Sequence, residues 1–431
     1  MPILSQFRRM TLGGACTAMC ALLTVASALA PAAEAAPVYN LVYAFKGGTT
    51  DGYAPSPRLT VLHAFNTTDG ADPTCRLAQD SAGILYGTTL SGGKQGAGTV
   101  FSLTPPAPGR TAWQFTSIWQ FNSVGAPVGG VVIDSAGNLY GAGSAGLGSV
   151  FRLTPPAKGQ TAWTETTLWI FKGGTGDGGN PSGGLTMGPD GTLYGTTAFD
   201  GPSGTGTVFS LSPPTGGGTS WTEQLIWTFP NGTTGAAPAA SLTLAADGTL
   251  YGTSGQGGAN ANGTVFQLAP PSSGQSAWTG TLLYSFPAGD LAQTFAEVTL
   301  AADGSLFGTT VLGGNKHHGS VFHLTPAGGG AWHYATIWHG ARKTDFIVGG
   351  VALSPAGDLF GVGGSLGDGA LFELTPPANG QLWAASLLAR FGRHTGEAPR
   401  ATPTLAANGV VYGTTEADGP GGAGTVFSLT R

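Results

Sequence analysis

Internal repetition limits the possible folds of this chain more than any other feature of its sequence. The pentapeptide LYGTT at residues 85–89 returns at 193–197, and it returns as VYGTT at 411–415. Looser copies raise the number to seven, with intervals of 52 to 57 residues between their central aromatic residues. These aromatic residues are Tyr86, Tyr140, Tyr194, Tyr251, Phe307, Phe360 and Tyr412. Self-similarity at a period of this length is typical of repeat architectures.

Each unit predicts four β-strands, which we name A, B, C and D. In the third unit the strands are expected at 183–187, 193–197, 207–211 and 221–229. A Pro-Pro pair ends strand C, because proline cannot donate a hydrogen bond to a sheet. In strand D a period of two places the large apolar residues on one face: Trp221, Leu225, Trp227 and Phe229.

Seven such units predict an all-β protein, a seven-bladed β-propeller of four-stranded blades. One four-stranded unit cannot bury its own apolar face, so a string of separate domains is excluded, whereas blades stacked around an axis bury both faces. A β-helix is the alternative architecture, but its rungs are much shorter than these units. A tryptophan near the start of strand D also suits the wedge between blades, which widens outward.

The two ends of the repeat array complement each other. The seventh unit contains strands A, B and C but lacks strand D. The missing pattern occurs at 59–65, where Leu62 and Phe65 match Ile118 and Phe121 of the first unit. We therefore predict that an N-terminal strand completes the last blade, which removes an open sheet edge.

We divide the chain into three segments. Residues 58–431 are expected to form the propeller. Residues 41–49 resemble 168–175, so 37–57 are predicted to be a remnant repeat or an outer strand. Residues 1–36 have the features of a signal peptide.

The signal peptide predicts a secreted or periplasmic protein. Arg8 and Arg9 precede a long apolar stretch, and 33–35 read Ala-Glu-Ala, the spacing of small residues that signal peptidase recognises. The arginine pair leaves the export route open between the general and the twin-arginine pathways. No later apolar segment is long enough to span a bilayer, so we expect no transmembrane segment after cleavage.

Composition narrows the possible functions. Charged residues make up 9% of the chain and the net charge is −5, so no basic stripe is available to follow a nucleic-acid backbone. Only Cys75 remains after removal of the signal peptide, which excludes an intrachain disulfide and a cysteine-based metal site. Its thiol is expected to be a small buried apolar group. The mature chain is expected to be a monomer with a protein or carbohydrate ligand.

The repeat unit, LYGTT-x-x-GG-x-x-G-x-G-TVF-x-LTPP, resembles the GloVer-type (Gloeo/Verruco) tandem repeat of secreted bacterial proteins. The resemblance extends over about 38–431. It implies a secreted β-propeller of tandem repeats, and it implies no particular activity or catalytic residues. Function must therefore be sought where the units differ from one another.

One difference is a set of polar residues in the loops of units five to seven. In a propeller the B–C and D–A loops share one face, and units one to four have mostly Gly, Ser, Thr and Asn there. A histidine pair with acids nearby could bind a metal or transfer protons. A solvated charged rim is the alternative interpretation. The candidate ligand-binding residues are Lys316, His317, His318, Lys343, Asp345, Arg393, His394 and Glu397.

Asp-Gly pairs also occur in the expected D–A loops, at 51–52, 69–70 and 177–178. Calcium is the one cofactor that such carboxylates suggest, but it takes about six to eight oxygen ligands, usually from several acids. Asp-Gly also forms tight turns, and the sequence favours this interpretation.

Strand A supplies two charged residues that are expected to line the axial channel. Arg76 in unit one and Glu297 in unit five stand where other units have Gly, Ser or Thr. They could orient a small polar ligand, or they could be solvated residues of the channel wall.

These observations favour a non-enzymatic binding or scaffold module that recognises a protein or glycan through its loop-bearing face. The alternative is a propeller hydrolase or lactonase with an axial metal. That alternative requires acids from several blades to converge near the axis, and strand A supplies essentially Glu297 alone.

Overall fold

The computed structural model describes residues 57–431 with seven short gaps. The gaps are 123–124, 217, 288–292, 315–316, 341–346, 365–368 and 378–382. The predicted signal peptide (1–36) and all but the last residue of the predicted remnant (37–57) lie outside the described residues. Within those residues, helical structure is limited to one 3₁₀ turn, Pro230–Gly232, and no helix has the length and apolar character needed to cross a bilayer.

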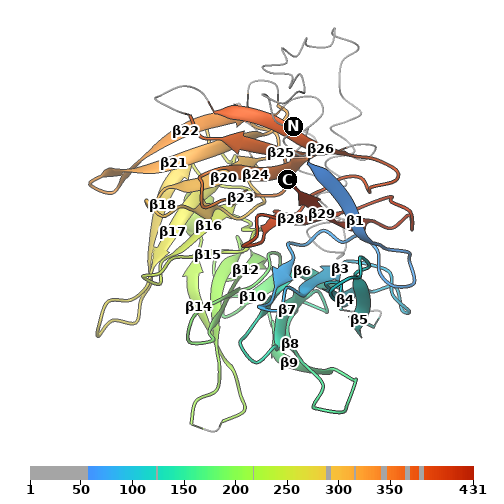
Figure 1. Cartoon of the computed structure of the whole chain (residues 1–431). Helices are drawn as coiled ribbons and strands as arrows, with labels where there is room; N and C mark the ends of the chain where they lie inside the picture. The colour runs from blue at the N-terminus through green and yellow to red at the C-terminus, as the bar shows by residue number, and fades with distance from the viewer. Residues whose placement is uncertain are drawn as a thin grey trace, which may run out of the picture.

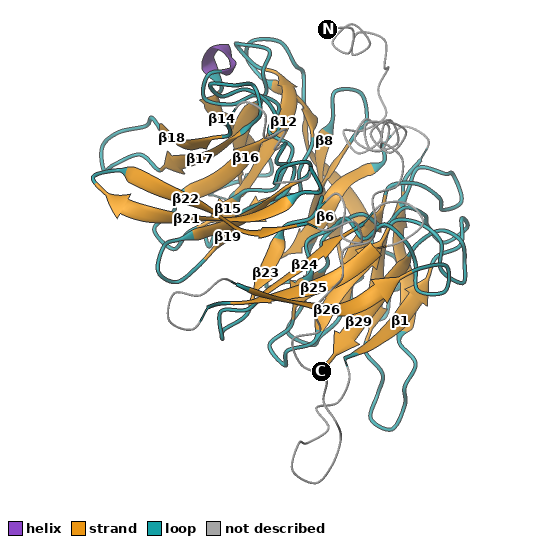
Figure 2. Ribbon diagram, turned by 90° about the horizontal axis from the view of Figure 1, so that it is seen from above, coloured by secondary structure: helices purple, strands orange, loops and turns teal. Residues whose placement is uncertain are grey.

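Seven antiparallel sheets lie in a ring around a central axis, which confirms the predicted seven-bladed β-propeller (Figures 1 and 2). Blade 1 contains β2 (Ala78–Gln79), β3 (Leu85–Thr89), β4 (Thr99–Thr104) and β5 (Gln114–Gln120). Blade 2 contains β6 (Pro127–Ile133), β7 (Leu139–Gly143), β8 (Ser149–Thr154) and β9 (Thr164–Ile170). Blade 3 contains β10 (Gly178–Pro181), β11 (Thr186–Met187), β12 (Leu193–Asp200), β13 (Thr207–Ser212) and β14 (Thr222–Thr228).

The second half of the ring repeats this order. Blade 4 contains β15 (Thr243–Leu244), β16 (Leu250–Ser254), β17 (Thr264–Ala269) and β18 (Thr279–Ser285). Blade 5 contains β19 (Thr299–Leu300), β20 (Leu306–Thr310), β21 (Ser320–Gly328) and β22 (Ala331–His339). Blade 6 contains β23 (Val351–Leu353), β24 (Leu359–Gly363), β25 (Gly369–Thr375) and β26 (Ala384–Phe391). Blade 7 contains β27 (Thr404–Leu405), β28 (Val411–Thr415), β29 (Thr425–Thr430) and β1 (Arg58–Ala64).

The N-terminal strand β1 closes the ring, as predicted. It pairs antiparallel with β29, with Arg58 opposite Thr430 at one end. His63 occupies the position that Trp119 holds in blade 1. Its ring stacks on Phe115 of blade 1, with 3.9 Å between the ring centroids. An aromatic contact between the two blades is therefore kept although the tryptophan is missing.

The glycine of the LYG motif makes room for the phenylalanine of the TVF motif on the neighbouring strand. Gly195 lies opposite Phe209, and a β-carbon added to Gly195 would lie 2.5 Å from Cζ of that ring. An equally close approach, 2.3 to 2.6 Å, recurs in all seven blades. The two motifs recur together because they form one packing unit.

The two threonines of LYGTT have different partners. In five blades the first residue of the pair donates a hydrogen bond to a backbone carbonyl in strand A of the next blade or shortly before it, as Thr88 does to Gly129 at 2.6 Å. In five blades the hydroxyl of the second residue pairs with a hydroxyl on strand C, as Thr89 does with Thr99 at 3.0 Å. One hydroxyl thus links neighbouring blades and the other fastens strand B to strand C.

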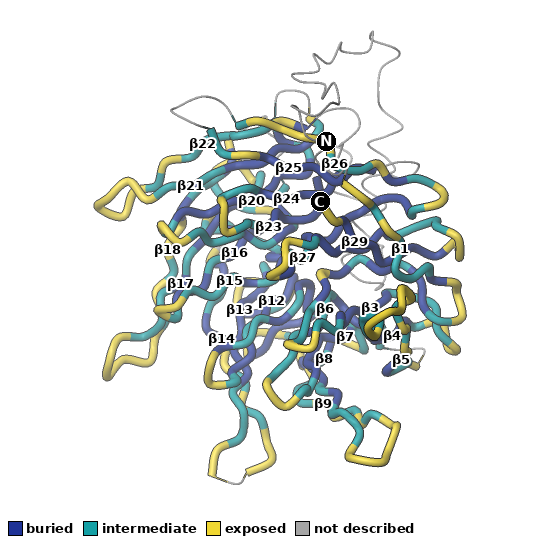
Figure 3. Tube along the Cα trace, in the orientation of Figure 1, coloured by how far each residue is buried: buried dark blue, intermediate teal, exposed yellow. Residues whose placement is uncertain are grey.

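The core consists of seven apolar clusters, each shared by two neighbouring blades. Strands B and C are mostly buried, whereas the exposed residues lie in loops, in turn tips and along the outer strand D (Figure 3). The tryptophan of one blade packs edge-on against the LYG aromatic of the preceding blade. Trp278 and Tyr194, for example, have 6.0 Å between ring centroids and 72° between ring planes. The large aromatic residues therefore fill the wedge between blades.

Strand D does not keep one face along its length, contrary to the prediction. Its pairing with strand C shifts at a β-bulge between Val208 and Phe209, and the same shift occurs in all seven blades. Trp221 therefore packs with the cluster between blades 2 and 3, whereas Trp227 and Phe229 pack with the cluster between blades 3 and 4. The extra residue of a bulge changes the side to which the following side chains point.

Strand A of blade 3 is also shorter than predicted. Of the predicted residues 183–187, only Thr186 and Met187 pair with β12, and β10 pairs with the end of the same strand. Gly183 instead packs against the backbone of Ala240 in blade 4, and a β-carbon there would lie 2.4 Å from the carbonyl carbon of Ala240. Contacts between blades near the axis thus replace hydrogen bonds within the blade.

Candidate binding site at the propeller axis

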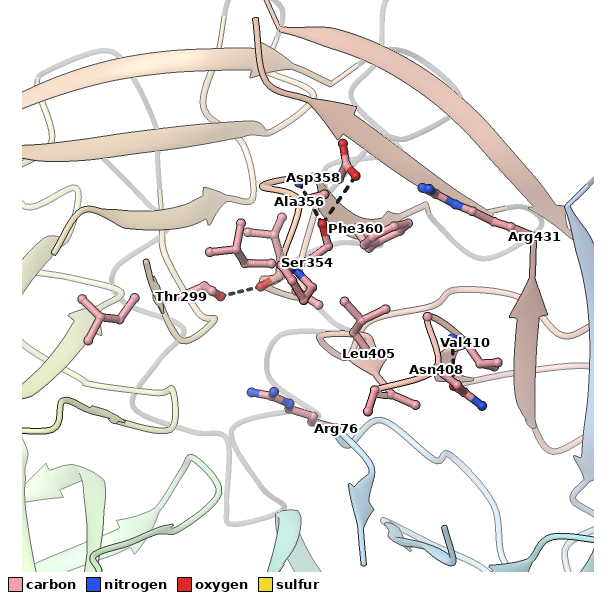
Figure 4. Close-up of a pocket in the computed structure, with 18 of the residues that line it drawn as sticks. Arg76, Thr299, Ser354, Ala356, Asp358, Phe360, Leu405, Asn408, Val410 and Arg431 are labelled. Atoms are coloured by element: carbon pink, nitrogen blue, oxygen red, sulfur yellow. Dashed lines mark hydrogen bonds between the residues drawn. The ribbon is translucent and has the colours of Figure 1, made fainter. Parts of the chain in front are cut away.

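A cavity of about 1090 Å³ occupies the propeller axis (Figure 4). Its wall consists of the inner strands β15, β19, β23 and β27 and of the A–B turns of blades 6 and 7. Two consecutive residues at the end of blade 7, Thr430 and Arg431, also line the cavity. The cavity therefore belongs to the side of the propeller that carries the A–B turns. This is not the face of the B–C and D–A loops, where the sequence predicted a ligand.

Two charged side chains meet at the inner end of this cavity. Nη1 of Arg76 lies 3.4 Å from Oε1 of Glu297, and the two residues come from blades 1 and 5. The equivalent positions in the other five blades carry small residues, which leave space for this contact across the channel. These five are Gly130, Gly184, Ser241, Gly350 and Thr402. The structure thus brings together the two residues that the sequence placed at the axis.

Hydroxyl groups of strand A hold the cavity wall in place. Thr299 donates a hydrogen bond to the carbonyl of Val351 in the next blade (Figure 4). Thr404 donates in the same way to the carbonyl of Leu77, at 2.7 Å. Neighbouring inner strands are therefore joined by side chains, although they do not share a sheet.

Arg431 is a second arginine of the cavity wall, and the sequence analysis did not single it out. Its guanidinium forms an ion pair with Glu373 and lies over the ring of Phe360, with 4.9 Å between its central carbon and the ring centroid. The ion pair links the end of the closing blade to blade 6. No local sequence signal identifies this pair, because 58 residues separate its members.

The structure describes five of the eight loop residues that the sequence singled out as candidate ligand-binding residues. The other three lie outside the described residues: Lys316, Lys343 and Asp345. His317, Arg393 and His394 are exposed, and no hydrogen bond or ion pair between described residues joins these three to one another. His318 is half-buried and Glu397 is buried. The residues described there alternate between solvent and the protein interior.

A buried charge cluster at the seam between blades 7 and 1 was also missed. Arg400, with 5% of its side chain exposed, pairs with Glu416, and among the described residues its Nη1 has no hydrogen-bond partner. Ser91 donates a hydrogen bond to Asp72 at 2.5 Å. Burial raises the pKa of Asp72; the Ser91 hydrogen bond opposes this shift, and the negative charge of Glu416 adds to it. The available signal was Arg400 itself, because the other six units have an uncharged residue there.

Of the two Asp-Gly pairs that the structure describes, 69–70 lies at a turn and 177–178 lies where β10 begins. Asp69 accepts a hydrogen bond from the backbone N–H of Asn66 at 2.9 Å, and Asp177 accepts one from Lys172 at 2.8 Å. Within the described ranges, no group of three or more His, Cys, Asp or Glu side chains is placed to hold a metal ion. Cys75 is buried, as predicted, and its Sγ lies 3.3 Å from the carbonyl oxygen of Thr88.

The fold defines a β-propeller, with a cavity at its axis. The chain belongs to the Gloeobacter/Verrucomicrobia repeat family, whose model matches residues 43–223, 142–344 and 218–427. This confirms the resemblance that the repeat unit indicated. No curated protein sequence matches the chain.

Solved structures with a similar fold have low sequence identity to this chain. A protein from Lactobacillus plantarum is 19% identical with a TM-score of 0.50, and the match covers 74% of this chain and 84% of that one. An ulvan lyase is 9% identical with a TM-score of 0.50, covering 86% and 95%. A PQQ-bound aldose sugar dehydrogenase from Streptomyces coelicolor is 14% identical with a TM-score of 0.39, covering 87% and 98%. These similarities concern the propeller fold and not an activity.

Proposed function

We propose that this protein is an exported, non-enzymatic binding module that takes part of a glycan into its axial cavity. The cavity is the observation that carries the proposal. Its volume of about 1090 Å³ is slightly above the ~300–1000 Å³ typical of ligand pockets, and it leaves room for a short oligosaccharide. A folded protein could reach only the rim, so a glycan suits this cavity better than a protein surface does.

The cavity wall also supports a ligand with many hydroxyl groups. The strands β15, β19, β23 and β27 are the inner edges of their sheets, and an edge strand presents backbone N–H and C=O groups that its own sheet leaves unpaired. Sugar hydroxyls can both donate to and accept from such groups. Leu244, Leu300 and Leu405 lie in the same wall and offer apolar surface to the C–H face of a sugar ring.

A hydrolase or lactonase with an axial metal is the alternative function. Such a site needs several acids that converge on one point. The described residues place Asp358 in the cavity wall, where it accepts a hydrogen bond from the Ser354 hydroxyl at 3.4 Å. Two further acids lie beside the arginines of the wall, and both have partners: Glu297 contacts Arg76, and Glu373 pairs with Arg431. We therefore favour binding over hydrolysis.

The test is to obstruct the cavity and to measure binding to an array of neutral and acidic oligosaccharides. Ala407 lies exposed in the A–B turn of blade 7 and lines the cavity, so Ala407→Trp should place a large ring at its mouth. Ala246 holds the same turn position in blade 4, is also exposed and does not line the cavity, so Ala246→Trp is the matched control.

We expect Ala407→Trp to weaken binding of every oligosaccharide that the natural protein retains by about tenfold or more, and Ala246→Trp to leave binding unchanged. Equal binding by both variants would place the ligand elsewhere and reject the proposal. Failure of the natural protein to retain any oligosaccharide would reject it as well.

A further inference from the structure

We propose that the axial site recognises a carboxylate group on its ligand, with Arg76 as the anchor and Glu297 as an internal carboxylate that occupies the anchor when no ligand is bound. This inference rests on the proposed function and names the ligand chemistry of the same cavity. It follows from the two charged residues in a ring of otherwise small ones at the inner end of the cavity.

Arg76 has hydrogen-bonding capacity to spare. A guanidinium carries five N–H donors. Among the described residues the side chain of Arg76 makes one polar contact, at 3.4 Å from Glu297, whereas a charge-assisted N–H···O bond is usually about 2.7–2.9 Å long. Its side chain is 56% exposed, lines the cavity and extends into the open space at the axis (Figure 4). A ligand in the cavity can therefore reach the guanidinium directly.

The internal partner indicates which ligand group fits. A carboxylate can accept two parallel hydrogen bonds from one guanidinium, and the protein itself places the carboxylate of Glu297 beside Arg76. The pair carries one positive and one negative charge. A ligand monoanion adds one negative charge to this balance, whereas a phosphate dianion would add two beside Glu297. A carboxylate is accordingly the anion that the site accommodates at the smaller electrostatic cost.

The other arginine of the cavity wall is less suited to this role. The ion pair of Arg431 with Glu373 and its contact with the ring of Phe360 fix its guanidinium against blade 6. Arg76 has no comparable support, since its one partner lies across the channel in blade 5. Arg76 is therefore the cation of the cavity that is free to exchange partners.

Glu297 competes with the ligand for Arg76, so the two partners of this ion pair should have opposite effects on affinity. Arg76→Gln removes the anchor and should weaken binding of a carboxylate ligand. Glu297→Gln keeps the shape of the side chain but removes the competing charge, and it should strengthen binding. A purely structural ion pair would instead give two variants that lose stability together and that treat charged and uncharged ligands alike.

The experiment measures binding of tetragalacturonate and of its methyl-esterified form by isothermal titration calorimetry. The two probes have the same length, and esterification removes the carboxylate charge. Arg110→Gln, on an exposed C–D turn of blade 1, controls for the loss of one arginine charge. The melting temperature of each variant shows that it is folded.

We expect Arg76→Gln to weaken binding of tetragalacturonate by about tenfold or more, which is the usual effect of losing a charge-assisted hydrogen bond. Glu297→Gln should strengthen it severalfold, Arg110→Gln should change nothing, and no variant should alter binding of the ester. An ester that binds as tightly as the acid, or an unchanged affinity in Arg76→Gln, would overturn the inference. The proposed function would then still stand or fall by the effect of Ala407→Trp on the same two probes.

A second arm separates two sources of the carboxylate. It uses a short peptide with a free terminal carboxylate and the same peptide with a terminal amide. Binding of the peptide acid that depends on Arg76, with no binding of tetragalacturonate, would support the anchor and overturn the glycan part of the proposed function. Competition by inorganic sulfate but not by acetate would overturn recognition of a carboxylate.

Discussion

At the residue scale, the same motifs recur in each repeat because their residues pack or hydrogen-bond in pairs. Gly195 has no side chain because Phe209 fills that space from the neighbouring strand. Thr88 ties its blade to the next one through the carbonyl of Gly129. Such pairs explain why whole motifs recur, since a change in one member leaves the other without its partner.

Gly195→Ala tests this packing. The added methyl group would lie 2.5 Å from the ring of Phe209, which is 1% exposed and has little room to move. We expect the substitution to lower the free energy of unfolding by about 1–3 kcal/mol, as overpacking of a core usually does. Gly176→Ala, where a β-carbon would meet open space, is the control in the same urea titration. Equal stability of the two variants would contradict this account of the motif.

Glu223 on β14 should make stability depend on pH. Burial raises its pKa from 4.5 to about 7, and the negative charge of Asp177 adds to the shift. The folded protein therefore holds this proton more tightly than the unfolded chain does. The resulting stabilisation is present below about pH 4.5 and is lost as the pH rises through about 7.

Glu223→Gln should remove that pH dependence. Between pH 5 and pH 8 the melting temperature of the natural protein should fall relative to that of the variant. The reason is that only the natural protein must bury an ionised carboxylate at the higher pH. Glu165→Gln, at the same position of strand D in blade 2, controls for the exchange of an acid for an amide. Parallel melting curves of the natural protein and Glu223→Gln across this range would show that Glu223 does not titrate there.

At the element scale, the strand that matters most is β1, because it converts an open array into a ring. It covers the edge of β29 along its length and brings Phe65 into the cluster between blades 7 and 1. The sequence predicted this role from the pattern at 59–65. It did not predict the bulge in β14, where Val208 lies opposite Trp227 and Phe209 lies opposite Leu225. The consecutive apolar residues at 225–227 interrupt the alternation and were the available signal.

Two truncations distinguish the contribution of β1 to stability from that of the segment before it. A chain that begins at residue 65 should have a much lower melting temperature than one that begins at residue 37, because the shorter chain exposes the edge of β29. Removal of 37–56 leaves β1 in place and should have a much smaller effect. Thermal unfolding followed by circular dichroism distinguishes the two, and similar losses from both truncations would show that β1 is not what closes the ring.

At the scale of the whole molecule, the core is divided among seven seams, and the axis is the place where the blades meet without sharing a sheet. The cavity arises there because the inner strands are short and most residues around the channel are small. The candidate site of this protein is thus a property of the ring and not of any blade.

The sequence by itself determined the number of units, the four strands of each and the strand that closes the ring. The first two features depend on contacts between residues close in the chain, such as Gly195 with Phe209, and local patterns record such contacts. The closing strand pairs with the far end of the chain, and the sequence identified it because it repeats the pattern of strand D. Only the tertiary structure decided that Arg76 meets Glu297, 221 residues away, and that Arg400 is buried against Glu416. Whether two residues meet across the axis depends on the angles between all the blades that separate them. The sequence of a single repeat of about 54 residues does not contain this information.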